Sequence, residues 1–176
     1  MNDETKQNED NTNEAQAQGG AEQGANEQAR AYALQRMYLK DVSFESPNSP
    51  DIFTMDWKPH INLNLGSTSR SIDENLYEVI LKVSVEAKVE DKTAFLIELE
   101  QAGIFHAQGF EPQELHRILG QLSPEHLYPF AREAVASMAM HGGFPQLLLQ
   151  PINFEALYHR TLEEKMKMQE QQGGNA

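Results

Sequence analysis

The sequence has no cysteine, and this absence excludes several kinds of site. Disulfides, thiolate metal sites and cysteine nucleophiles are ruled out, and the composition fits a reducing compartment. Long hydrophobic runs are also absent, as the short aliphatic stretch "LLL" at 147–149 illustrates. The amino terminus lacks a basic start followed by an apolar stretch. We therefore predict neither a signal peptide nor a membrane span, and expect a cytoplasmic protein.

Positive charge is scarce along the chain. Lys and Arg number 14 against 27 Asp and Glu, which gives a formal net charge of −13. Residues 1–30 contribute −5 of this charge, so the remaining residues are acidic in their own right, at −8. An acidic surface repels phosphate backbones and anionic lipid headgroups. We therefore predict no nucleic-acid partner and no direct membrane insertion, and expect basic or unfolded proteins as partners.

Motifs that carry catalysis or bind metals are lacking. The six histidines show no pair at metal-ligand spacing such as H-E-x-x-H, and no G-x-S-x-G, P-loop or G-x-G-x-x-G motif occurs. We therefore predict no metal site, no cofactor and no catalytic residue. An enzyme using the carboxylates of Asp41 and Glu45 is the weakest alternative, because a polar sheet face offers no cleft.

Both ends of the chain differ in composition from its middle. Residues 1–29 are almost entirely polar or small after the starting Met, so they have little apolar area to offset the entropy lost on ordering. The end, "MQEQQGGNA", has the same character. We predict a disordered acidic tail at 1–30, one folded domain at 31–164 and a second disordered tail at 165–176.

An alternating pattern dominates the first half of the folded domain. The segment "NLYEVILKVSVEAKV" at 75–89 alternates apolar and polar residues, and "AFLIELEQAGIF" at 94–105 does so again after the turn "EDKT". Together they predict an antiparallel hairpin. Segments 60–65 and 38–45 add two more strands, the latter with Tyr38, Val42 and Phe44 as its apolar residues. The pattern therefore predicts a four-stranded antiparallel sheet with one polar face.

The period becomes helical after about residue 111, and the clearest helical pattern runs over residues 123–143. Its apolar stripe begins at Leu127 and ends at Met138, with Ser123 as the expected N-cap and Pro129 at a start or a bend. This helix is apolar nearly all round, so we expect another subunit to cover the side that the sheet leaves free. A last helix is expected after Asn153 as its N-cap.

Two proline-containing segments carry most of the remaining apolar residues. The first, "SPNSPDIF", is flanked by Phe44 and Trp57, and the second is "GGFPQLLLQPINF" at 142–154. Stiff apolar loops that face each other would line a groove for an extended apolar peptide with little loss of entropy on binding. A plain packed core explains the same residues equally well at this point.

Six segments occur in an order that we associate with one protein family: "YLKDVSFESPNSP", "DWKP", "LYEVILKV", "AFLIELEQAGIF", "LYPFAREAVASM" and "FPQLLLQPINFEALY". Together they cover residues 32–160, and over this range the chain resembles the SecB family of protein-export chaperones. The tails depart from the family: the amino-terminal extension is longer, and the end carries Lys165 and Lys167.

The resemblance implies an α+β fold, in which two main helices pack on one face of the four-stranded antiparallel sheet. It also implies a homotetramer, assembled as a dimer of dimers with the helices between two sheets. The implied activity is that of an ATP-independent holdase. Such a protein binds unfolded preproteins, keeps them competent for translocation and delivers them to the motor ATPase SecA.

The family's sites carry over to two sets of residues in this sequence. The implied client-binding residues are Phe44, Phe53, Trp57, Phe144, Leu147, Leu149, Ile152, Phe154 and Tyr158. The implied partner-docking residues are Asp41, Glu45, Leu96 and Glu98. A small-ligand carrier, with a pocket between sheet and helix, remains the second interpretation after the chaperone. An enzyme is the third.

Overall fold

The computed structural model describes residues 29–173, and the expected tail at 1–30 therefore lies almost wholly outside the described residues. These residues form four strands and three α-helices in the order β1 (Ala31–Glu45), β2 (His60–Asp73), β3 (Leu76–Val89), β4 (Lys92–Gln108), α1 (Pro112–Arg117), α2 (Ser123–His141) and α3 (Phe154–Gly173). A short 3-10 turn, Asp51–Thr54, lies between β1 and β2. The predicted fold class is confirmed for the single chain.

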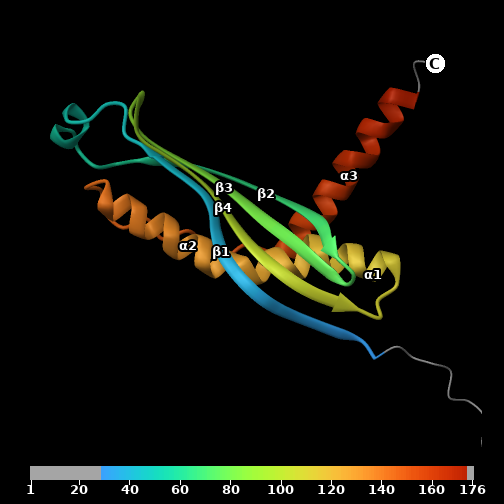
Figure 1. The fold of residues 1–176 in the computed structure, drawn as a ribbon. Coiled ribbons are helices and arrows are strands. Elements are labelled where there is room, and N and C mark those ends of the chain that lie inside the picture. Colours follow the sequence, from blue (N-terminus) through green and yellow to red (C-terminus); the bar gives the residue numbers. More distant parts are fainter. Residues whose placement is uncertain (1–28, 174–176) are drawn as a thin grey trace, which may run out of the picture.

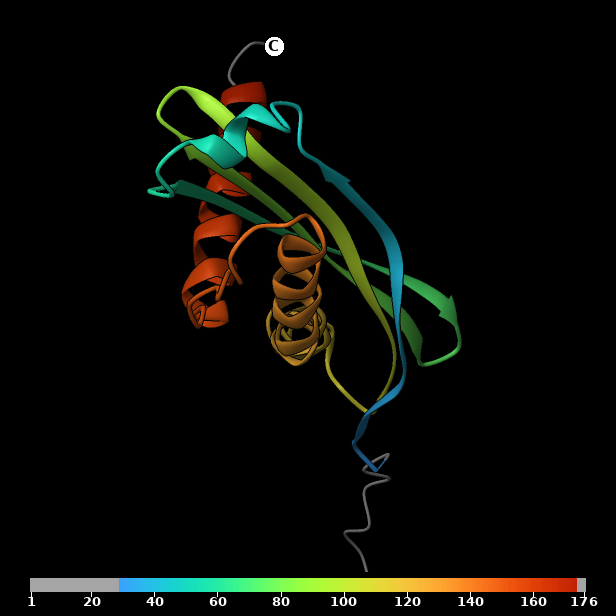
Figure 2. The ribbon, with the colours of Figure 1, turned by 90° about the vertical axis from the view of Figure 1, so that its left-hand side faces the viewer.

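All neighbouring strands of the sheet are antiparallel, in the order β1-β4-β3-β2. The strands β1 and β2 thus form opposite edges, and residues 46–59 carry the chain across one end of the sheet, as Figures 1 and 2 show. We call this segment the crossover loop. The predicted hairpin is present as β3 and β4; β3 matches its predicted range to within one residue, whereas β1, β2 and β4 are longer than their patterns indicated.

The two faces of the sheet differ as the alternation predicts. Odd-numbered residues of β3 and β4, among them Leu81, Val85 and Phe95, are buried on the face that the helices cover. Even-numbered residues such as Lys82, Glu86 and Glu98 lie on the other side, which we call the outer face. Figure 2 shows α2 and α3 on the same side of the sheet.

The helical region begins at Pro112, next to the predicted residue 111, but Ser123 is not an N-cap. Helix α1 continues through a π-helical turn, Ile118–Leu122, directly into α2, and Ser123 itself has helical dihedral angles. The Ser123 side chain is fully buried, and its hydroxyl donates a hydrogen bond to the Ile118 carbonyl at 3.0 Å. Pro129 lies inside α2, so the predicted alternative of a helix start there is wrong.

Helix α3 begins as predicted but extends further. The Ala156 N–H donates to Asn153 Oδ1 at 2.9 Å, which confirms the predicted N-cap. The helix continues to Gly173, so most of the segment expected as a disordered tail at 165–176 is helical. In Figure 1 its carboxyl-terminal part diverges from the sheet.

Candidate functional site

Five aromatic rings gather where the crossover loop meets the segment after α2. Phe144 stands at their centre: its ring centroid lies 5.0 Å from those of Phe53 and Phe95, 5.3 Å from Trp57 and 6.5 Å from Phe44. We call these five residues the aromatic cluster. Phe144 is only 6% exposed, whereas Phe53 is 51% exposed. The cluster therefore has a buried base and one ring that faces solvent.

Backbone geometry directs Phe144 into this cluster. Gly143 has a φ of +85°, which a residue with a side chain rarely adopts, and it turns the chain back after α2. The Phe144 N–H donates to the Ala139 carbonyl at 3.0 Å. Gly142 leaves room for the ring of Phe44, since a Cβ there would lie 2.7 Å from Phe44 Cε2.

The crossover loop is fixed to the sheet by side-chain hydrogen bonds. Ser46 Oγ donates to the Ala94 carbonyl at 2.8 Å, and Asn48 Nδ2 donates to the Thr93 carbonyl at 2.9 Å. Ile52, in the 3-10 turn, is almost fully buried and anchors the loop from below. The aromatic residues on this loop are thus held in place without a partner chain.

The second apolar segment, 144–154, contains both core and surface residues. Leu149 and Phe154 are buried, and Leu147 and Ile152 are partly buried. Leu148, which the sequence analysis did not single out, is 64% exposed. Tyr128 Oη donates to the Gln150 carbonyl at 2.6 Å and ties this segment to α2.

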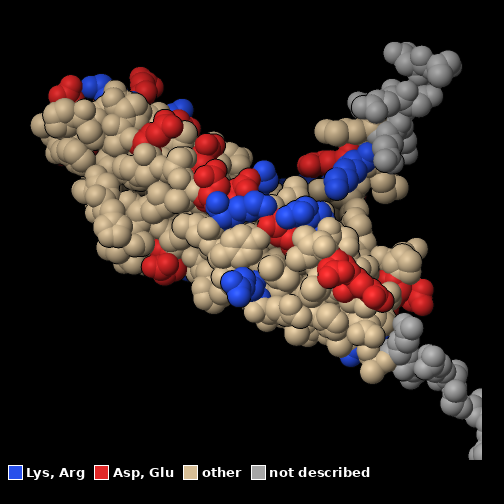
Figure 3. Space-filling model, in the orientation of Figure 1, with Lys and Arg blue, Asp and Glu red and all other residues tan. Residues whose placement is uncertain are grey.

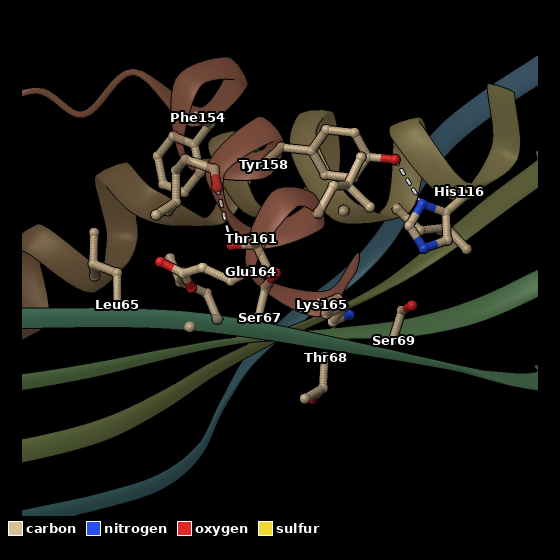
Figure 4. A pocket seen from close by; sticks show the side chains of 16 residues that line it. Leu65, Ser67, Thr68, Ser69, His116, Phe154, Tyr158, Thr161, Glu164 and Lys165 are labelled. Carbon is tan, nitrogen blue, oxygen red and sulfur yellow. Dashed lines mark hydrogen bonds between the residues drawn. The ribbon is translucent and has the colours of Figure 1, made fainter. Parts of the chain in front are cut away.

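A hollow of about 550 Å³ lies between β2 and α3. Figure 4 shows Leu65, Ser67 and Ser69 of β2 on one side of it and Phe154, Tyr158 and Thr161 of α3 on the other. The Tyr158 hydroxyl and His116 Nδ1 lie 2.6 Å apart, which joins α3 to α1. Burial raises the pKa of Tyr158, with the charge of Arg117 opposing it, so the hydroxyl keeps its proton at neutral pH.

A second hollow of about 500 Å³ adjoins the first along β2 and is lined in part by Leu63, Ile152 and Leu157. The two hollows and the aromatic cluster all lie on the helix-covered side of the sheet. The cluster is aromatic, and the hollows are lined by both apolar and polar side chains. This arrangement suits an extended, mostly apolar chain. Among the described residues, no group of acids and histidines is arranged to hold a metal ion.

The predicted docking residues meet on the outer face, on the other side of the sheet from the aromatic cluster. Strand pairing places Glu45 opposite Leu96, Ser43 opposite Glu98, and Asp41 opposite Glu100. The four predicted residues therefore occupy three successive cross-strand positions of β1 and β4. Among the described residues, no Lys or Arg is within ion-pair distance of Asp41, Glu45 or Glu98.

One carboxylate of the outer face is buried. Glu78 is 3% exposed and accepts hydrogen bonds from Lys40 Nζ at 2.8 Å, from Arg70 Nε at 2.5 Å and from the Tyr38 hydroxyl. The hydrogen bond from Lys40, and after it that from Tyr38, lowers the pKa of Glu78 from 4.5 to about 2, although burial opposes this shift. We call these four residues the Glu78 cluster. The sequence analysis missed it.

Comparison with known proteins accounts for the sequence and the fold together. The family described as preprotein translocase subunit SecB matches residues 25–165. The chain belongs to the SecB family. A SecB protein-export protein of Methylococcus capsulatus is 50% identical over 134 residues, which cover 76% of this chain and 86% of the relative. One of Hahella chejuensis is 46% identical over 138 residues, with 78% and 87% covered.

A solved structure carries the same fold. A SecB-like chaperone of Mycobacterium tuberculosis, in complex with a peptide from an antitoxin, aligns with a TM-score of 0.57 at 16% identity, covering 69% of this chain and 87% of the other. Family membership thus confirms the resemblance and makes this chain a SecB-family protein-export chaperone, in preference to a small-ligand carrier or an enzyme. None of the described helices is long and apolar enough to cross a bilayer.

Proposed function

We propose that this SecB-family chain is an ATP-independent holdase of the cytoplasm, which binds unfolded preproteins and delivers them to SecA. The observation that carries the client-binding part is the half-exposed ring of Phe53 on a buried aromatic base, on the same side of the sheet as two hollows lined by both apolar and polar side chains. A rigid surface of this kind binds extended chain without first having to order itself.

Within the proposed client site, the predicted residues have unequal roles. Phe53, Trp57, Leu147, Ile152 and Tyr158 keep exposed area and contact the client directly, joined by Leu148. The buried residues of the predicted set support these from beneath: Phe144, Leu149 and Phe154, with Phe44 partly buried beside them. Replacing a residue of the first group should weaken client binding more than it weakens the fold.

The proposed docking site for SecA is the outer-face group Asp41, Glu45, Leu96 and Glu98. Three carboxylates without ion-pair partners add little to the stability of the fold, and a basic partner would supply the missing charges. Charge reversal at Asp41 and Glu45 should weaken SecA binding most at low ionic strength, because salt screens such pairs over a Debye length of about 8 Å.

The proposed assembly is a homotetramer, a dimer of dimers. On α2, Phe130 is 48% exposed and Met140 is 50% exposed, so the helix presents apolar area on the side away from the sheet. Apolar patches of this kind mark interfaces, and a stable one typically buries at least about 1,000 Å². Sedimentation equilibrium should give the mass of four chains, and a stable monomer at micromolar concentration would contradict the proposal.

The experiment that tests the function measures whether the purified protein keeps an unfolded preprotein soluble in the absence of nucleotide. Aggregation of a slow-folding preprotein is followed by light scattering, and handover is followed by adding SecA with ATP and membrane vesicles that carry the translocon. We expect suppression of aggregation without ATP and an increase in translocated preprotein. Suppression that requires ATP, or an absence of any suppression, would refute the proposal.

A further inference from the structure

Several cations of the outer face are already paired, whereas the proposed docking acids have no ion-pair partner among the described residues. Lys82 pairs with Glu100 at 2.7 Å, while Lys40 and Arg70 both bind Glu78. Figure 3 shows acidic side chains along the sheet and Lys and Arg side chains gathered near its middle. The docking acids therefore remain unpaired because other groups hold the neighbouring cations.

Lys40 is one cation that could neutralise the docking site, because it directly precedes Asp41 in the chain. The pairing of β1 with β4 shifts between Leu39 and Asp41, so Lys40 is an extra residue in the strand. In a regular strand, residues three apart point to opposite faces, but the extra residue of a bulge brings them to the same face. Tyr38 and Asp41, three residues apart, consequently both lie on the outer face, opposite Ala102 and Glu100.

Glu78 determines where the Lys40 side chain points. It lies on β3 opposite Ile104 of β4, and β4 separates it from β1, but Ala102, the next outer-face residue along β4 and the partner of Tyr38, has a small side chain and leaves a gap beside Ile104. Lys40 Nζ crosses this gap and reaches Glu78 Oε1 at 2.8 Å. The Lys40 ammonium group therefore lies toward β3, where it pairs with Glu78 and not with its neighbour Asp41. The Asp41 carboxylate has no ion-pair partner among the described residues.

We propose that Glu78 is a positioning residue for partner docking, which holds Lys40 away from Asp41 and so keeps the outer-face acids free for a basic partner. This inference rests on the proposed docking of SecA. Without Glu78, Lys40 has beside it in the chain an outer-face carboxylate with no ion-pair partner among the described residues, that of Asp41. An ion pair there would mask one of the three docking charges and place a positive charge beside the other two.

The test uses Glu78→Gln, which keeps the size of the side chain and removes its charge. We expect this variant to bind SecA about three- to tenfold more weakly at low salt, with the defect shrinking as salt increases. A crystal structure of the variant should show Lys40 Nζ within ion-pair distance of Asp41. Client binding should stay at the wild-type level, because the client site lies on the other side of the sheet.

Two further variants separate positioning from a loss of structure. Adding Lys40→Met to Glu78→Gln should restore SecA binding, since the masking cation is gone, whereas damage to the sheet would persist. Arg70→Met is the matched control, because it removes a partner of Glu78 but leaves Lys40 bound. It should therefore bind SecA normally.

The outcomes distinguish a failure of this proposal from a failure of the docking proposal on which it rests. If Glu78→Gln binds SecA as the wild type does, or if Lys40→Met fails to restore binding, Glu78 is only a structural tie between strands. If charge reversal at Asp41 and Glu45 leaves SecA binding intact, the docking site itself is wrong. Titrations of all variants at two salt concentrations, with circular dichroism as the check on folding, yield each answer.

Discussion

Replacing two rings of the aromatic cluster separates client binding from folding. Phe53 is 51% exposed and Phe144 only 6%, although their ring centroids are 5.0 Å apart. An aromatic side chain presents about 200 Å² of surface, so Phe53 offers a client about 100 Å². At about 25 cal/mol per Å² this area is worth up to about 2.5 kcal/mol of binding free energy, or about 70-fold in affinity.

The same substitution at Phe144 acts on the fold instead. Phe144→Ala removes a ring in contact with four others and leaves a cavity among them, so we expect a loss of about 3–5 kcal/mol of unfolding free energy. For a domain of this size that corresponds to a fall in Tm of at least about 6 °C. Phe53→Ala, at the solvent boundary, should lower Tm by clearly less.

Calorimetry and titration with an unfolded preprotein, both applied to the two variants, test this reasoning. We expect Phe53→Ala to lose affinity, by about tenfold or more, while it remains folded at the assay temperature. Phe144→Ala should instead be detected first by its lower Tm. If Phe53→Ala bound client as tightly as the wild type, the exposed half of this ring would lie outside the client site, and the aromatic cluster would be only a core.

Three further results are expected. Gly142→Ala should destabilise the protein by about 1–3 kcal/mol in chemical denaturation, because the new Cβ would lie 2.7 Å from Phe44 Cε2; unchanged stability would show that this ring moves freely. Folding lowers the pKa of Glu78 from 4.5 to about 2, so the ionised carboxylate stabilises the fold above pH 4.5 and this stabilisation is lost as the pH falls toward 2. The unfolding free energy of Glu78→Gln should therefore depend less on pH between 4.5 and 2 than that of the wild type. An unchanged pH dependence would contradict the lowered pKa of Glu78. Asn153→Ala should lower stability by about 1 kcal/mol through loss of the N-cap of α3, whereas Asn153→Asp should preserve it.

The sheet could be predicted well from sequence because burial on one face imposes a period of two. In β3 and β4 most odd-numbered residues are apolar and buried, and the hairpin between these strands has the expected position. The same rule placed Leu96 and Glu98 on the outer face, and Asp41 and Glu45 together on the neighbouring strand. Where a strand has no bulge, local alternation alone was sufficient to predict which face of the sheet each residue occupies.

Errors arose where tertiary packing decides the local structure. Ser123 followed by Pro124 looks like a helix start, yet the helix continues through it because the π-helical turn, Ile118–Leu122, supplies a buried carbonyl acceptor for its hydroxyl. In "LLL", spacing alone could not determine that Leu148 points outward while Leu149 is buried, since this segment has no regular secondary structure. Leu147 and Leu148 are therefore the pair to replace in order to weaken client binding, since a change at the buried Leu149 would also disturb the core.

The Glu78 cluster illustrates what a one-dimensional pattern cannot contain. In "LYEVILKV", Glu78 reads as one more polar residue of a solvated face, but it is buried because side chains from both edge strands converge on it. That convergence depends on the bulge before Asp41 and on the small side chain of Ala102, two features separated by about 60 residues. Because the same bulge sets the direction of Lys40 and the exposure of Asp41, a substitution at Glu78 should change partner docking without touching any residue that docks.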